Sequence, residues 1–231
     1  MIPRVTVHRP LQDYGPATKL LGALDYLRTT DRKFDHVITF DDDCYYNDPR
    51  AVIEYLERGA AQKPGAVITL GGIRLDRPPY RNKNGLFHNC SGYVDIVCGW
   101  RGVLYPVDAL MRDTRVFDLQ ADMPPGVAHD DDAYFGICMS RMDIPVYALK
   151  DLRHTNDGTR LHVTSCEGGG GSAVQERVAK DRVDNEMEIV QHAVAHGWLP
   201  SRMAAREKQS AIVTMMRRNR VLRKFVKAMD F

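Results

Sequence analysis

The chain has no run of about 18 uninterrupted apolar residues, which is the length that a membrane-spanning helix needs. It also has no basic and apolar leader that ends in a cleavage signal. Its five cysteines are scattered, without the paired spacing of a zinc site or of a disulfide framework. We therefore expect a protein of the cytoplasm whose cysteines are reduced and mostly structural.

The chain also has little net charge, but the charge is unevenly distributed. The formal net charge is +2, whereas residues 202–231 hold nine Lys or Arg against Glu207 and Asp230. Apolar residues from Ile212 to Met229 recur near helical spacing among these cations, which predicts a basic amphipathic helix. Such a helix could lie on an anionic membrane surface, or pack on the rest of the chain or on a second copy. No aromatic platform or recognition motif accompanies the charge, so we expect no nucleic-acid partner.

The 44% hydrophobic content is enough for one core, which we assign to residues 1–200, with residues 201–231 as the basic tail. Helices are predicted over residues 16–27, 49–58, 130–142 and 175–196. Strands are predicted over residues 5–8, 37–40, 66–70 and 145–149 and within 93–106. This alternation predicts an α/β fold, a three-layer sandwich around a mostly parallel mixed sheet, with the ligand site at the carboxyl ends of its strands.

Residues 37–43, VITFDDD, form an apolar strand that ends in three consecutive carboxylates. Side chains alternate along a strand, so Asp41 and Asp43 would face one side and Asp42 the other. Two convergent carboxylates suit a hard cation such as Mg2+ or Mn2+, which keeps positions open for phosphate oxygens. Such a site could hold a nucleotide diphosphate. The alternative is a solvated acidic turn, because Asp is a common turn residue.

A second acidic run, Asp130 to Asp132, follows His129 at the start of a predicted helix. Carboxylates there are favoured by the helix dipole and can cap free N–H groups. One cap explains one Asp, which leaves a candidate general base for an acceptor hydroxyl.

Residues 98–106, CGWRGVLYP, lie between the two acidic runs. Gly99 and Gly102 permit close approach to a ligand, and Trp100 could stack on a sugar ring or belong to the core. Two other segments have loop composition. Residues 74–90 could cover a ligand, and residues 167–172, EGGGGS, could form a hinge near His154 and His162.

Four segments together resemble the nucleotide-sugar-dependent glycosyltransferases of the GT-A fold, in particular small bacterial and large-DNA-virus members near family 2. They are DYGPATKLLGAL at 13–24, VITFDDDCYYNDP at 37–49, CGWRGVLYP at 98–106 and HDDDAYFGICMSRMDIPVYAL at 129–149. The resemblance covers most of residues 5–200 and implies a Rossmann-like sandwich. One departure is that GT-A domains usually begin with a strand that helps to build the nucleoside pocket. Residues 5–8 match the second strand, so the first one is missing here.

The resemblance implies transfer of a sugar from a nucleotide-diphosphate donor, a UDP-sugar being favoured, to a hydroxyl of a glycan or lipid-linked acceptor. It implies Mn2+ or Mg2+ as the cofactor and, in inverting members, a carboxylate base. We expect inversion, because the well-placed carboxylates fit metal ligands and a base, with retention as the alternative. We expect the protein in the cytoplasm or on the cytoplasmic face of a membrane. The resemblance implies Asp131 as the base, Asp41 on the ribose side of the donor, and Asp43 and His154 for the metal, with His162 as the alternative to His154. We further predict Asp130 for catalysis, Asp42, Lys19 and Arg9 for the donor, and Trp100, Arg101 and Asp132 for the acceptor.

Two other functions are compatible with parts of this pattern. A phosphatase of the haloacid dehalogenase type also places Asp-x-Asp after a strand, but its second Asp is normally followed by x-Thr or x-Val. Here Asp43 is followed by Cys44 and Tyr45. A module that binds sugar nucleotides or glycans without turnover is the second alternative, because the first nucleoside-binding strand is missing.

Overall fold

The computed structural model describes residues 7–10, 12–41, 44–46, 48–75, 86–87, 91–99, 102–121, 130–150, 163–165 and 188–198. The helical elements are η1 (Gly15–Ala17), α1 (Thr18–Thr29), α2 (Pro49–Gln62), α3 (Val107–Leu110), η4 (Thr114–Ala121) and α4 (Asp131–Arg141), with a further helix over residues 188–195. The strands are β1 (His36–Thr39), β2 (Cys44–Tyr46), β3 (Val67–Thr69), β4 (Gly72–Ile73), β5 (Leu86–Phe87), β6 (Gly92–Val94), β7 (Ile96–Val97), β8 (Val103–Pro106), β9 (Val146–Ala148) and β10 (Val163–Ser165).

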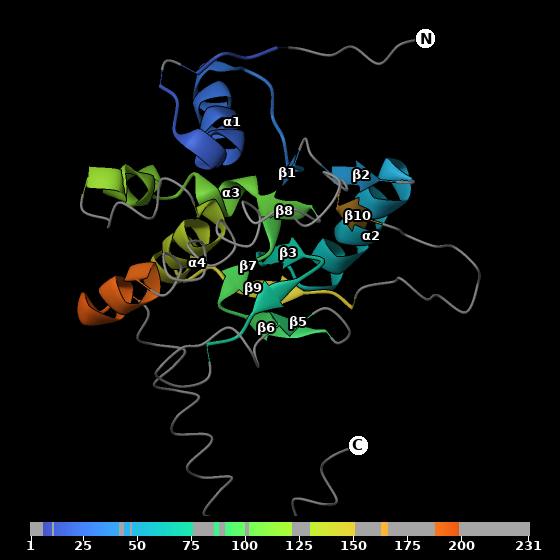
Figure 1. The fold of residues 1–231 in the computed structure, drawn as a ribbon. Helices are drawn as coiled ribbons and strands as arrows, with labels where there is room; N and C mark the ends of the chain where they lie inside the picture. Colours follow the sequence, from blue (N-terminus) through green and yellow to red (C-terminus); the bar gives the residue numbers. More distant parts are fainter. Residues whose placement is uncertain are drawn as a thin grey trace, which may run out of the picture.

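Five strands form the main sheet in the order β1-β8-β3-β9-β6 (Figure 1). Strand β8 pairs antiparallel with both β1 and β3, and β6 pairs antiparallel with β9. Only β3 and β9 are parallel neighbours among the described strands of this sheet. The predicted α/β class and mixed sheet are therefore confirmed, but the prediction of mostly parallel pairing is wrong. Strands β1 and β3 do run in the same direction, as alternating strands and helices predict, but β8 lies between them in the opposite direction.

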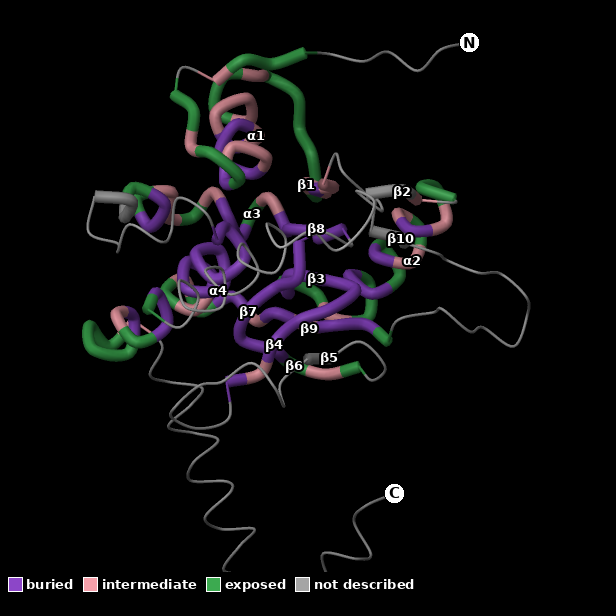
Figure 2. The backbone as a smooth tube through the Cα atoms, in the orientation of Figure 1, coloured by how far each residue is buried: buried purple, intermediate pink, exposed green. Residues whose placement is uncertain are grey.

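Apolar clusters cover the two faces of this sheet, because side chains alternate along each strand. On β8, Leu104 packs in the cluster with Leu56 of α2, whereas Val103 and Tyr105 belong to the cluster that contains α1 and α4. Figure 2 shows the strands β3, β8 and β9 as buried between these helices. The main sheet therefore has helices on both faces. Two smaller sheets accompany it, one of two strands in the order β10-β2 and one of three strands in the order β5-β4-β7.

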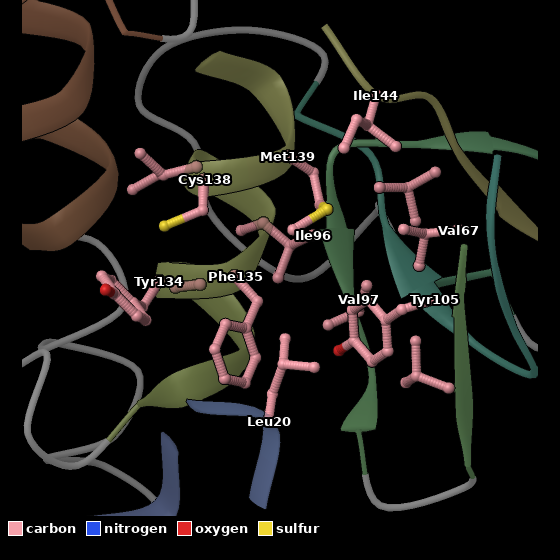
Figure 3. Packing of buried hydrophobic residues seen from close by; sticks show 14 of the residues in the cluster. Leu20, Val67, Ile96, Val97, Tyr105, Tyr134, Phe135, Cys138, Met139 and Ile144 are labelled. Atoms are coloured by element: carbon pink, nitrogen blue, oxygen red, sulfur yellow. The ribbon is translucent and has the colours of Figure 1, made fainter. Parts of the chain in front are cut away.

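Helix α4 packs directly on β7. A Cβ added at Gly136 would lie 2.6 Å from the backbone oxygen of Asp95, so a glycine at this position lets the helix approach the strand. Figure 3 shows Phe135 and Met139 of α4 pointing toward Ile96 and Val97, with Leu20 of α1 next to Phe135. These contacts fix the start of α4 relative to α1 and to the strand ends.

The three predicted helices over residues 16–27, 49–58 and 130–142 are confirmed as α1, α2 and α4. The strand predicted over residues 5–8 is wrong in its described half, because Val7 and His8 form no strand and Val7 is 78% exposed. An exposed segment without a neighbouring strand has no partner for its backbone. The segment 74–90, predicted as a loop, contains the short strand β5, paired with β4.

Several other predictions lie outside the described residues. They concern the first part of the helix at 175–196, the EGGGGS segment and the basic tail. No helix in the described ranges combines the length and the apolar character that are needed to cross a membrane.

Candidate functional site

The two acidic runs of the sequence meet at the ammonium group of Lys19. Lys19 Nζ donates a hydrogen bond to Asp41 Oδ1 at 2.5 Å and lies 2.8 Å from Asp131 Oδ2. Asp41 lies two residues beyond the end of β1, after Phe40, and Asp131 is the first residue of α4. The side chains of Lys19 and Asp131 are 20% and 8% exposed, so this is a partly buried ion-pair network. The predicted convergence of Asp41 with Asp43 lies outside the described residues; the described part of the chain instead brings Asp41 together with Asp131, through Lys19 of α1.

Local hydrogen bonds and apolar packing together position Lys19 on α1. The Asp13 carboxylate accepts hydrogen bonds from Gly15 N and from the Thr18 hydroxyl, which fixes the turn before the helix. The apolar stripe of α1, which includes Leu20 and Leu24, faces the core. Lys19 precedes this stripe and emerges at its edge, where the strand end and α4 supply carboxylates.

The three aspartates at the start of α4 make three different contacts. Asp130 is the N-cap residue, and its side chain accepts a hydrogen bond from Ala133 N at 3.2 Å. Asp131 pairs with Lys19, and Asp132 Oδ1 accepts a hydrogen bond from Gly99 N at 2.8 Å. The capping interpretation is therefore confirmed for Asp130. Asp131 and Asp132 instead form, with Lys19 and Asp41, a group of charged side chains that we call the acidic cluster. All three are buried, with 2%, 6% and 8% exposure.

Gly99 lies at the centre of this arrangement. A Cβ at position 99 would be 2.5 Å from Asp132 Oδ1 and 3.0 Å from Lys19 Nζ. A turn follows, in which Gly102 N donates to Gly99 O at 3.0 Å and Gly102 adopts a φ of +97°, a value that favours glycine. Gly99 was expected to allow close approach of a ligand, and the structure shows close approach of the Asp132 and Lys19 side chains.

The charges of the cluster change the ionisation of two neighbouring groups. Burial alone would lower the pKa of the Lys19 ammonium, but attraction to Asp131 and hydrogen bonds to Asp131 and Asp41 outweigh it and raise the pKa. Burial, together with the negative charges of Asp132 and Asp131, raises the pKa of the Tyr105 phenol well above its ordinary value. The cluster therefore keeps Lys19 charged and Tyr105 neutral.

Tyr105 was not among the predicted site residues, although it lies behind the carboxylates. Its ring is 1% exposed and meets Phe135 of α4 edge-on, with the ring centroids 6.2 Å apart. The sequence does contain a signal for it, because Tyr105 is two residues after Val103 in an apolar strand and must share its face. This alternation predicts on which face of the strand Tyr105 lies, but it does not predict that Asp131, Asp132 and Phe135 lie next to it.

The remaining predicted residues are not brought together by the described part of the chain. Arg9 is exposed and forms no ion pair with any carboxylate in the described ranges. The other predicted residues lie outside the described residues: Asp42, Asp43, Trp100, Arg101, His129, His154 and His162.

The cluster is compatible with a hard cation in its chemistry, although the described residues alone do not form a complete set of ligands. Among the described residues, Asp41 and Asp131 both contact the Lys19 ammonium, and Asp132 lies close enough to raise the pKa of Lys19 by its charge. The Asp41 side chain is 26% exposed and so is accessible from solvent. Carboxylate oxygens are the ligands that Mg2+ and Mn2+ prefer. No group of three His, Cys, Asp or Glu side chains placed to hold a metal occurs within the described ranges.

The fold and this cluster define an α/β protein with a partly buried carboxylate and lysine site at the end of a sheet strand. No protein-family model and no curated protein sequence matches the chain.

Proposed function

We propose that the protein is a metal-dependent glycosyltransferase that moves a sugar from a nucleotide-diphosphate donor to a hydroxyl acceptor. The observation that carries this proposal is the meeting of Asp41 and Asp131 at Lys19. These carboxylates come from two of the four segments that resemble GT-A transferases. Their proximity places three groups that the reaction needs side by side: a carboxylate on the donor side, a fixed ammonium, and a second carboxylate for the acceptor.

Asp131 is the residue that we assign as the general base. It would accept the proton of the acceptor hydroxyl as that oxygen attacks the anomeric carbon. Its contact with Lys19 holds the carboxylate in one position, which is a requirement for proton transfer in a defined geometry. Asp130 belongs to the same acidic run as Asp131, but its side chain caps α4. We therefore assign it no role in proton transfer.

Lys19 and Asp132 have supporting roles in this proposal. Lys19 would neutralise part of the charge that develops on the departing diphosphate, because its raised pKa keeps it cationic. Asp132 orients the backbone at Gly99, where the acceptor side of the site begins. With a base present and no nucleophile assigned, the reaction proceeds by direct displacement and inverts the anomeric centre.

The proposed cofactor is Mn2+ or Mg2+, held by Asp43 and His154 with Asp41 on the ribose side of the donor. When bound, such a cation stabilises the negative charge of the leaving diphosphate. The donor that we propose first is a UDP-sugar, and the acceptor is a glycan or a lipid-linked hydroxyl compound. We place the reaction in the cytoplasm, with the basic tail as a possible contact with an anionic membrane or with a second copy.

The test is a turnover assay on the full chain with UDP-, GDP-, dTDP- and CMP-sugars, with Mn2+ or with a chelator. We expect metal-dependent release of nucleotide and transfer of the sugar. The variant Asp131→Asn should lose turnover by about a hundredfold or more, which is the usual contribution of a general base. It should keep donor affinity, measured by calorimetry, because Asp41 and the other donor groups remain.

The matched control is Asp113→Asn, because Asp113 is an exposed carboxylate paired with the exposed Arg115 outside the cluster. This variant should keep full turnover. Donor binding without any nucleotide release would identify a silent binding module instead. Full activity of Asp131→Asn would remove Asp131 from the chemistry.

A further inference from the structure

We propose that a second pocket, between α2 and the strands β6 and β9, binds an anionic sugar, meaning a sugar with a phosphate or a carboxylate group. The cavity has a volume of about 270 Å3. It is not part of the acidic cluster, because α2 lies on the other face of the sheet from α1 and α4 (Figure 1). The side chains that form its walls and its polar rim are Tyr55, Arg58, Gln62, Ser91, Tyr147 and Lys150.

The pocket is built by the close packing of α2 on the sheet. A Cβ at Gly59 would lie 2.8 Å from Leu149 Cδ1 and 2.9 Å from Ile68 Cγ2, so the helix can approach this closely only without a side chain there. Tyr55, Arg58 and Gln62 follow one another at helical spacing and therefore form one stripe beside this contact. The Tyr55 hydroxyl donates a hydrogen bond to the backbone oxygen of Lys150 at 3.0 Å, which ties the helix to the end of β9.

The pocket is positively charged. Arg58 and Lys150 line it, and no acidic residue does so within the described part of the chain. Neither cation forms an ion pair with a carboxylate from the described ranges. A third cation, Lys63, lies over the Tyr147 ring, with its Nζ 4.9 Å from the ring centroid. An anionic group that enters the pocket would therefore meet two cations that no carboxylate of the described ranges pairs with.

Two tyrosine rings give the pocket apolar walls. The Arg58 guanidinium lies 5.7 Å from the centroid of the Tyr55 ring, and Tyr147 packs edge-on against Tyr93 with the centroids 5.1 Å apart. Such contacts hold the rings in place at little cost in side-chain freedom. The amide of Gln62 and the hydroxyl of Ser91 add groups that can both donate and accept hydrogen bonds.

This combination of cations, aromatic walls and neutral polar groups matches a sugar ring that carries one anionic group. The anionic part follows from the charges alone. The choice of a sugar rests on the proposed function, in which the acceptor is a glycan, and the pocket would then bind an acidic unit of such a glycan.

The test is a titration of the 15N-labelled full chain, followed by NMR, in the absence of divalent metal and of any nucleotide. The probes are glucuronate, glucose 6-phosphate, neutral glucose and inorganic phosphate. We expect saturable shifts of the amide signals in residues 55–62 and 147–150 with both anionic sugars, weaker binding of inorganic phosphate, and no binding of glucose. The tighter of the two anionic sugars identifies the preferred anionic group.

The double variant Arg58→Gln and Lys150→Gln should weaken binding of the anionic sugars by about tenfold or more, because it removes two charge-assisted hydrogen bonds. The matched control is Arg28→Gln, because Arg28 is paired with Asp25 on α1, on the other face of the sheet. This control should bind as the parent chain does, and the spectrum of each variant reports whether it is folded.

Three results would overturn the inference: no saturable shifts with either anionic sugar, unchanged affinity of the double variant, or equal binding of glucose and glucuronate. Inorganic phosphate that binds as tightly as glucose 6-phosphate would overturn the sugar assignment. The titration contains neither donor nor metal, so a failure of the proposed transferase activity gives a different pattern of results from a failure of this pocket.

Discussion

The two faces of the sheet differ in what they bury. The face under α2 is closed by aliphatic side chains such as Leu56, Ile68 and Leu104, and its polar groups are confined to the rim. The opposite face also has an apolar core, but Asp131 and Asp132 are buried at its end. Buried carboxylates cost free energy unless they are paired or hydrogen-bonded, and Lys19 and Gly99 supply these partners. A site that retains such groups beside an apolar core is where chemistry is expected, whereas the buried aliphatic cluster under α2 contributes to stability.

The largest expected effect is a loss of stability caused by a substitution in the core under α2. Leu56 is fully buried, so Leu56→Ala should lower the free energy of unfolding by about 2 to 5 kcal/mol, through lost apolar contacts and the cavity left behind. Denaturant unfolding measures this loss. Metal-dependent donor binding, the property that we assign to the other face, should not change under native conditions.

The control for Leu56→Ala is Glu57→Ala, one residue further along the same helix and exposed. Its effect on unfolding should stay within about 0.5 kcal/mol. If Leu56→Ala weakened donor binding while the chain remained folded, the separation of the two faces would be wrong.

A medium-sized effect is expected at the carboxylate cluster. A Cβ at position 99 would overlap with Asp132 and crowd Lys19, so Gly99→Ala should lower the free energy of unfolding by about 1 to 3 kcal/mol. It should also reduce turnover, because Asp132 must move away from the backbone N–H that holds it. Denaturant unfolding and the turnover assay are measured on the same preparation.

Gly22→Ala is the matched glycine variant. A Cβ at Gly22 would make only ordinary contacts, the nearest at 3.5 Å, and alanine favours a helix interior. This variant should be neutral or slightly stabilising. Equal destabilisation by both alanines would mean that the crowding at Gly99 does not matter.

The smallest effect concerns pH dependence within α4. Burial raises the pKa of the Cys138 thiol from its ordinary value of 9.0 to about 12. Above pH 9 the unfolded chain loses this proton while the folded chain keeps it, so stability falls as pH rises. The loss should reach about 1 kcal/mol by pH 10.

Cys138→Ala should remove this contribution and flatten the decline of the unfolding free energy between pH 8.5 and pH 10. Denaturant unfolding at several pH values measures the slope. An identical slope in the parent chain and the variant would show that the thiol ionises equally in both states.

The sequence by itself determined the local elements of this protein. Asp48 before Pro49 marks the start of α2, and the Asp48 side chain accepts a hydrogen bond from Ala51 N as an N-cap residue should. Asp130 marks the start of α4 in the same way, and the apolar spacing of α1 gave its buried face. Such signals act within one or two turns of the chain, so a single sequence is enough to find them.

Only the tertiary structure decided which of these elements are neighbours. The insertion of β8 between β1 and β3, the pairing of Lys19 with both Asp41 and Asp131, and the position of Tyr105 behind them all depend on contacts between distant segments. The same holds for the pocket between α2 and β9, which no local pattern indicated. The physical reason is that strand pairing and helix packing are selected by the fit of the whole core, whereas capping and periodicity depend on adjacent residues alone.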